Sequence, residues 1–237
     1  MEIDETVVKL ISQYRLQSLG SAGLLWIIEK LQIKPFYAHL ASKNPGNLLP
    51  YHNFYHAGNM LLNCYEGAVQ TGLPLNETRG VCVAALLHDF NHSGGHLPDA
   101  ENIINAKNGL IGAQAIATID SMELSEYEFE IAYMAIETTQ YPYQGNLAHA
   151  TGAIIRDADL MHPYDENKKA MIEHYLGLKK EIEIQHGHPY TVKEFADGMK
   201  DFLDTITWHS NWGARKANVR NWALAKSYLF DNLSNQL

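Results

Sequence analysis

Cysteine and long apolar runs are scarce in this sequence of 237 residues. The two cysteines, Cys64 and Cys82, have neither metal-finger nor redox spacing, so we predict buried structural thiols in a reducing compartment. The most apolar early segment, residues 23–28, is far shorter than the about 20 residues that cross a bilayer. The acidic N-terminal residues 1–6 also lack the basic start of a signal peptide. We therefore expect a cytoplasmic protein that has no membrane partner.

Positive charge is scarce as well, since 18 Lys and Arg face 27 Asp and Glu, for a net charge of −9. This balance argues against a nucleic-acid polymer as a partner, because such polymers bind basic surfaces. A small anion remains an acceptable partner, because bound metal ions reverse the local field of a pocket. The chain contains no internal repeat and no long Gly/Ser/Pro linker, so we predict a single domain over residues 1–237.

The apolar residues recur at three- and four-residue spacing rather than alternately, which predicts helices instead of strands. The stripe formed by Phe195, Met199, Phe202 and Ile206 is one example. Residues 125–128 and 191–194 have the capping-box pattern of helix starts, and residues 72–74, 94–95 and 141–142 are typical helix stops. The sequence therefore predicts an all-α fold, a compact domain of eight to ten helices.

Histidine is abundant, with 12 in the chain, and it is the commonest metal ligand in proteins. His52 and His56 are four residues apart, so they share a face if residues 53–70 form the helix that their apolar spacing predicts. This spacing is a weak signal by itself, because two ordinary surface or core-edge histidines show it too.

A second group begins with His88 and Asp89, which directly follow the apolar run at residues 81–87. A charged aspartate at the end of a buried helix is costly unless it is paired or bound to metal. A divalent cation would satisfy both side chains. In the alternative, both residues have structural roles: Asp89 caps a helix, and His88 forms a hydrogen bond with a carbonyl. His92 lies one turn further on, and the glycines at 94–95 let the chain leave without crowding the site.

The third group contains Asp157 and Asp159, which follow the buried helical stretch around Ile154 and Ile155. Two residues apart, they cannot share a helix face, so we expect one to point into the core and the other outward. The three groups together form a mixed His and Asp set that suits Zn²⁺, Mn²⁺, Mg²⁺ or Fe²⁺. Cysteine is absent from this set, which favours a catalytic site with open positions over a structural zinc site.

These motifs resemble those of the HD-domain metal-dependent phosphohydrolases, and most closely the catalytic domain of class I cyclic nucleotide phosphodiesterases. Residues 51–57 match that family's Tyr-His-Asn-x-x-His-Ala block. Residues 84–94 match its Ala-Ala-x-x-His-Asp-x-x-His-x-Gly block, and residues 158–163 match its Ala-Asp-Leu-x-x-Pro segment. The resemblance covers residues 45–165, implies an all-α fold, and identifies Asp159 rather than Asp157 as the last metal ligand.

The resemblance also implies a reaction. The implied metal ligands are His56, His88, Asp89 and Asp159. Two divalent ions are expected, with Asp89 bridging them, and metal-activated hydroxide would attack a phosphodiester. His52 would protonate the leaving alkoxide as general acid, and His92 would orient the attacking water or stabilise the hydration shell of the second metal. The expected substrate contacts are Tyr51, Asn53 and His162.

The C-terminal third departs from this family. The glutamine that clamps the nucleotide has no match, and neither does a Glu followed by paired histidines between the second and third motifs. Trp208, Trp212 and Trp222 lie there instead, and we expect core packing from them rather than base stacking. The histidines left without a role are His96, His149, His186, His188 and His209.

We therefore expect a hydrolase for a small anionic substrate, most simply a cyclic nucleotide. A nucleotidase or phosphomonoesterase on the same scaffold is the main alternative, because both reactions use the same activated water. A mixed-valence di-iron oxygenase and a non-catalytic nucleotide-binding protein are further alternatives. The sequence leaves the metal, the substrate and the oligomeric state open.

Overall fold

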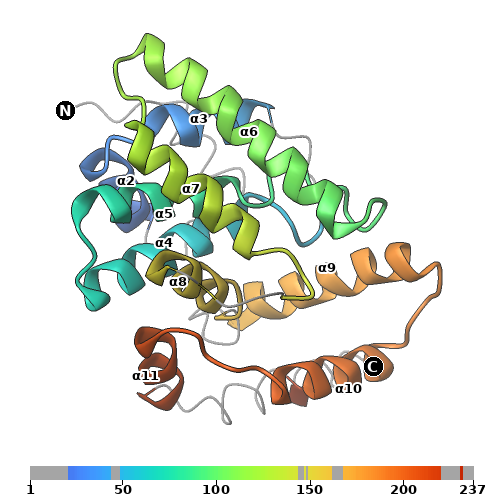
Figure 1. The fold of residues 1–237 in the computed structure, drawn as a ribbon. Helices are drawn as coiled ribbons and strands as arrows, with labels where there is room; N and C mark the ends of the chain where they lie inside the picture. The colour runs from blue at the N-terminus through green and yellow to red at the C-terminus, as the bar shows by residue number, and fades with distance from the viewer. Residues whose placement is uncertain are drawn as a thin grey trace.

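The computed structural model describes residues 21–43, 49–143, 147, 149–161, 168–219 and 230–231, and the regular elements within them are all helical. The main helices, in chain order, are α2 (Ser21–Lys30), α3 (Lys34–Lys43), α4 (Phe54–Thr71), α5 (Leu75–Leu87), α6 (Asp99–Ile119), α7 (Glu126–Thr138), α8 (Ala150–Asp159), α9 (Lys168–His186), α10 (Val192–Asp204) and α11 (Asn211–Val219) (Figure 1). The predicted all-α fold is confirmed. None of the described helices is long and apolar enough to cross a membrane.

Local capping chemistry sets several helix ends. Helix α4 begins after Asn53, whose side chain accepts hydrogen bonds from the backbone N–H groups of Tyr55 and His56. It ends at Gly72, which has φ of 75°, a left-handed conformation that glycine adopts without strain. The capping boxes predicted at Ser125 and Thr191 are both present, at the starts of α7 and α10.

Helix α5 lies at the centre of the main core and packs against α3, α4, α6, α7 and α8. Its residues 80–87 are all buried, which explains why this stretch of sequence is apolar around the whole helix. Gly80 permits a close approach to α7, because a Cβ there would lie 2.8 Å from the Glu128 carbonyl oxygen. Cys64 and Cys82 are buried, unpaired thiols in this core, as predicted.

Helices α9 and α10 form an antiparallel pair beside the main body and share a smaller apolar cluster (Figure 1). Its buried members are Ile172, Tyr175, Phe195, Ala196, Met199 and Leu203. Helix α9 approaches the main body at two glycines, because a Cβ at Gly177 would collide with Pro50 and a Cβ at Gly95 with the backbone of α9. These contacts place α9 directly over the segment that precedes α4.

Helix α11 closes the main body through Trp212, which is fully buried in the main core. The predicted packing role of Trp212 is therefore confirmed, while Trp222 lies outside the described residues. Asp157 contributes to the same junction, since its fully buried carboxylate accepts hydrogen bonds from the backbone N–H groups of His209 and Ser210. The expectation that Asp157 or Asp159 would point outward is wrong, because α11 covers Asp157.

Candidate active site

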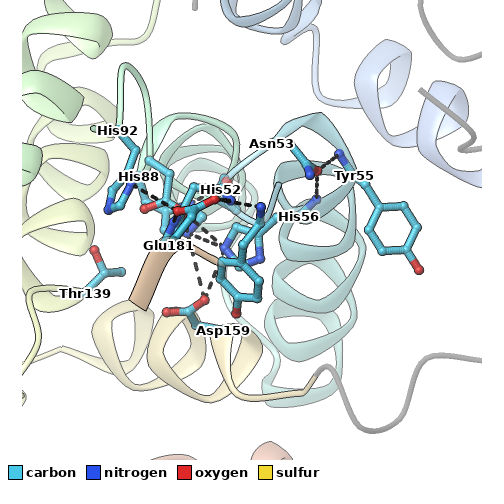
Figure 2. A network of polar contacts seen from close by, with 12 residues as sticks. His52, Asn53, Tyr55, His56, His88, His92, Thr139, Asp159 and Glu181 are labelled. Carbon is cyan, nitrogen blue, oxygen red and sulfur yellow. Dashed lines mark hydrogen bonds and ion pairs between the residues drawn. The ribbon is translucent and has the colours of Figure 1, made fainter. Parts of the chain in front are cut away.

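Three helix ends converge beneath one cavity. The first turn of α4 supplies His56, the end of α5 supplies His88, and the last residue of α8 supplies Asp159 (Figure 2). Asp89 directly follows His88 in the chain. The structure therefore brings together the four residues that the sequence predicts as metal ligands. We call them the His56 cluster. Their function as metal ligands stays a prediction.

The donor atoms of the His56 cluster lie close together. His56 Nε2 is 3.0 Å from His88 Nε2, 3.0 Å from Asp89 Oδ2 and 3.3 Å from Asp159 Oδ1. His88 Nε2 is also 2.9 Å from Asp89 Oδ2. Neighbouring ligands of an ion held at about 2.1 Å are about 3 Å apart when they meet at right angles. The spacing of these atoms therefore fits a divalent cation.

The hydrogen bonds around the His56 cluster support the same fit. His88 Nδ1 donates to the Ala85 carbonyl oxygen at 3.0 Å, which leaves the lone pair of a neutral imidazole on Nε2, directed at the cluster. Asp89 Oδ2 is buried and has no hydrogen-bond partner of acceptable geometry. An unsatisfied carboxylate oxygen facing an imidazole lone pair is unfavourable, and a cation between them removes the conflict.

The charge states within the His56 cluster depend strongly on one another. Burial alone would lower the pKa of His56, but the carboxylates of Asp159 and Asp89, 3.3 and 3.0 Å from its Nε2, raise this pKa to about 10. Burial would raise the pKa of Asp89, yet the neighbouring imidazoles of His88 and His52 hold it well below its usual range. Without a cation, a proton on His56 compensates the two carboxylates, so a bound metal ion would take the place of that proton.

A second group, His52, His92 and Glu181, lies next to the first, and we call it the His52 cluster (Figure 2). Glu181 Oε1 accepts a hydrogen bond from the Tyr51 backbone N–H at 2.7 Å, and its Oε2 accepts one from His52 Nδ1 at 2.6 Å. His92 Nδ1 accepts one from the Gly94 N–H at 3.1 Å. Because these donor atoms are already engaged, the His56 cluster is the better metal site of the two.

The two imidazoles of the His52 cluster differ in their affinity for a proton. Burial would lower the pKa of His52, but the negative charge of Asp89 and the hydrogen bond to Glu181 raise it above the ordinary value. Burial and the neighbouring His52 charge lower the pKa of His92 to about 4. The rings stack with centroids 3.6 Å apart. The surroundings of His52 therefore favour its protonated form, whereas His92 is neutral at neutral pH.

A cavity of about 790 Å³ opens above both clusters. The main body supplies one wall, through residues of α6 and residues 139–143, and α9 and α10 supply the other. His52, Asp89 and Asp159 all line the cavity, so a molecule within it would reach both clusters. The volume suits a small organic substrate.

Of the predicted substrate contacts, Tyr51 lines the cavity and Asn53 does not. Tyr51 lines the cavity, and its ring stacks on His174 with centroids 4.2 Å apart. Asn53 does not line the cavity, because its side chain caps α4 and donates to the Leu49 and Pro50 carbonyls. His162 lies outside the described residues. The histidines left without a role, His96, His149, His186, His188 and His209, are exposed.

Glu181 and His174 lie near the two clusters but were not identified from the sequence. Glu181 lies 129 residues from His52, on a helix that carries no recognisable motif. The available signal was the spacing of His174 and Glu181, which are seven residues apart and therefore share one face of α9. Gly177 lies between them on that face, where α9 meets Pro50.

Comparison with known proteins supports the fold. The sequence matches no protein-family model and no curated protein. Among solved structures, the chain is similar to the phosphodiesterase domain of the RhoPDE fusion protein from the choanoflagellate Salpingoeca rosetta. The two share 17% sequence identity with a TM-score of 0.58, over 99% of this chain and 90% of that one. The chain therefore has a phosphodiesterase-like, all-α fold.

Proposed function

We propose that this chain is a metal-dependent phosphoesterase that hydrolyses a phosphodiester. The observation that carries the proposal is the contrast between neighbouring clusters. In one, imidazole nitrogens and carboxylate oxygens converge around an unsatisfied Asp89 Oδ2, and in the other a buried carboxylate holds His52 and raises its pKa. Phosphodiester hydrolysis needs both elements, because charge develops on the phosphoryl oxygens while a poor leaving group requires a proton. The fold of the RhoPDE phosphodiesterase domain is consistent with this chemistry.

The His56 cluster would hold the metal ion, with two imidazoles and two carboxylates as ligands. A divalent ion bound there would neutralise phosphoryl charge and lower the pKa of water. A second ion bridged by Asp89, as the resemblance implies, remains part of the proposal. The carboxylates suit Mg²⁺ and Mn²⁺, while the imidazoles suit Zn²⁺ and Fe²⁺.

His52 would act as the general acid. Its Nδ1–H donates to Glu181, so the proton that His52 can release is the one on Nε2. In the reaction, water loses a proton to the solvent and forms a new P–O bond, the bond from phosphorus to the leaving oxygen breaks, and His52 protonates that oxygen. Glu181 would position His52 and stabilise its protonated form, because burial leaves the carboxylate only 3% exposed.

His92 would have a different task from His52. Its Nδ1 accepts a hydrogen bond from the Gly94 N–H, which leaves the proton of the neutral ring on Nε2. This N–H can donate to an oxygen in the cavity, since His92 is one of the lining residues. We propose that this N–H orients the attacking water or a phosphoryl oxygen. The cavity volume suits a substrate as large as a cyclic nucleotide.

The test begins with metal-stripped protein, to which Mg²⁺, Mn²⁺ or Zn²⁺ is returned singly. Hydrolysis is measured on cyclic nucleotides, on bis(4-nitrophenyl) phosphate and on the monoester 4-nitrophenyl phosphate. Diester turnover that requires a metal ion and disappears in His56→Ala supports the proposal, and exposed His149→Ala serves as the matched control. Turnover of monoesters alone would favour the phosphomonoesterase alternative, and turnover of no ester in any metal would refute the proposal.

A further inference from the structure

The charged side chains that line the cavity above the clusters are mainly acidic. None of the described residues that line the cavity is Lys or Arg. Five acidic residues do line it: Asp89, Asp99, Asp159, Glu181 and Glu194. Three of these carboxylates have partners in the proposed site: Asp89 and Asp159 would bind metal, and Glu181 is paired with His52. Asp99 and Glu194 are therefore left as negative charges that no lysine or arginine among the described lining residues balances.

Asp99 is the first residue of α6 and stands on the main-body wall of the cavity. Its Oδ2 accepts a hydrogen bond from the Tyr141 backbone N–H at 2.6 Å, which fixes the carboxylate between α6 and the segment after α7. Burial raises the pKa of Asp99, and the charges of Asp89 and Asp159 raise it further. Asp99 is thus close enough to the His56 cluster for its charge to be felt there.

Glu194 stands on the opposite wall, in the first turn of α10. Its carboxylate accepts hydrogen bonds from the Thr191 N–H and hydroxyl, both at 2.8 Å, and is therefore fixed at the cavity rim. Each of these two carboxylates lies at a helix N-terminus, whose positive end amounts to about half a unit charge. The helix dipoles therefore reduce the negative charge of the two walls without cancelling it.

The remaining wall between Asp99 and Glu194 is largely apolar or aromatic. The side chains that supply it include Leu97, Ile103, Ile182, Phe195, Met199 and Phe202. A second phosphate or a carboxylate placed there would lose part of its hydration, find no lysine or arginine among the described lining residues, and face the carboxylates of Asp99 and Glu194. An aromatic or aliphatic group would bury apolar surface, and a cationic group would be attracted by the carboxylates and the aromatic rings.

We infer that the cavity selects phosphodiesters whose only negative charge is on the scissile phosphate, with Asp99 and Glu194 excluding substrates that carry a second anionic group. The inference rests on the proposed function, because the His56 cluster with its metal would hold the scissile phosphate. It assigns the substrate class by charge: a monoanionic diester with a neutral or cationic body. Polyphosphates and diesters with a further phosphate are disfavoured.

A matched series of three diesters tests this inference. Each carries the same 4-nitrophenyl leaving group, and the second ester is phenyl, 4-carboxyphenyl or 4-(trimethylammonio)phenyl. In each reaction water adds to phosphorus and 4-nitrophenolate leaves, so only the charge of the retained body differs. At an effective dielectric of about 20, unit charges several ångströms apart change a binding constant by about tenfold or more. We expect kcat/KM for the carboxylate to fall at least about tenfold below that for phenyl, with no such loss for the cation.

The variants Asp99→Asn and Glu194→Gln locate the effect. We expect each to reduce the phenyl-to-carboxyphenyl ratio of kcat/KM, by about threefold or more for Asp99→Asn because Asp99 is the more buried. Glu101→Gln is the matched control, since Glu101 is exposed in the first turn of the same helix and does not line the cavity. An equal change in Glu101→Gln, or no change in either cavity variant, would overturn the inference.

A binding measurement separates this inference from the proposed function. Calorimetry with phenyl phosphate and 4-carboxyphenyl phosphate on the Mn²⁺-loaded protein reports the charge preference without turnover. Preferred binding of phenyl phosphate, reduced in Asp99→Asn, supports the inference even if no diester is hydrolysed and the proposed reaction fails. Equal binding and equal hydrolysis of neutral and carboxylate bodies would refute the inference while the proposed hydrolase stands.

Discussion

The His56 cluster and the His52 cluster both combine two histidines with carboxylates and lie next to each other, yet their donor atoms are engaged differently. In the His56 cluster the Nε2 atoms of His56 and His88 and the Oδ2 of Asp89 converge within 2.9 to 3.0 Å. In the His52 cluster, Glu181 is saturated by hydrogen bonds, and the Nδ1 atoms of both imidazoles are engaged. Histidine and carboxylate content alone therefore does not distinguish a metal site from a proton-transfer site. The distinction lies in which donor atoms neighbouring groups already occupy.

The largest loss of metal binding and of activity is expected when a ligand of the His56 cluster is removed. We expect His88→Ala to abolish stoichiometric metal binding and to lower diester hydrolysis by about 10³-fold or more, because the attacking water and the phosphoryl charge both depend on the ion. Elemental analysis after dialysis and steady-state kinetics provide the measurements. His96→Ala removes an exposed histidine of the following loop and should retain both properties. Full metal content in His88→Ala would contradict the assignment.

Removing the acid of the His52 cluster should leave the metal in place. We expect His52→Asn to lower hydrolysis of an alkyl diester by about 10² to 10³-fold, as is usual for loss of a general acid. With bis(4-nitrophenyl) phosphate the loss should be much smaller, because 4-nitrophenolate leaves without a proton. The ratio of the two rates is the measurement, and metal content serves as its control. Equal losses on both substrates would exclude His52 as the acid.

Metal affinity should depend on pH through His56. In the metal-free protein its pKa is raised to about 10, so at neutral pH the ring carries a proton that the cation must displace. The affinity should therefore increase as pH rises from 6 to 8, by up to about tenfold per pH unit for one released proton. Calorimetry in buffers of different ionisation enthalpy counts that proton. An affinity independent of pH would show that metal binding does not displace it.

The smallest effect is expected from Glu181→Gln. The amide can still accept from the Tyr51 N–H, but it no longer stabilises a positive charge on His52. The raised pKa of His52 keeps the acid protonated to higher pH in the native chain, so the variant should lose activity at lower pH. We expect the basic limb of the pH–rate profile to move down by about one pH unit, which corresponds to about 1.4 kcal/mol. Glu173→Gln, exposed on the same helix, should leave the limb in place, and an unmoved limb in Glu181→Gln would refute the positioning role.

The helices and their ends were predictable from the sequence because the signals are local. The capping boxes at Ser125 and Thr191 need only four consecutive residues, and both are present. The burial of residues 80–87 followed from their continuous apolar character. The position of His88 and Asp89 at the end of that helix followed in turn, and with it the expectation of a buried carboxylate that needs a partner. The extent of the single domain predicted over residues 1–237 stays a prediction.

Asp157 shows where local reasoning is insufficient. Helix periodicity correctly separated Asp157 from Asp159, but it does not report what covers the other face of α8. That face is covered by α11, where Gly213 packs against Asp157, and the two residues before α11 donate hydrogen bonds to the Asp157 carboxylate. Asn53 is a similar case, since the family resemblance implied a substrate contact there, and in the structure its side chain caps α4. Both outcomes depend on neighbours that spacing alone does not identify.

The sequence by itself determined the helical fold, because helix periodicity is a property of short segments. It also pointed to the residues of the His56 cluster, with Asp159 chosen through the family resemblance of its motifs. Only the tertiary structure decided that Glu181, 129 residues from His52, holds the neighbouring imidazole and occupies the donor atoms of the His52 cluster. The same holds for the cavity, where Asp99 and Glu194 come from separate helices onto opposing walls. The physical reason is that the proton affinity of a side chain depends on the atoms around it, and folding brings those atoms from distant parts of the chain.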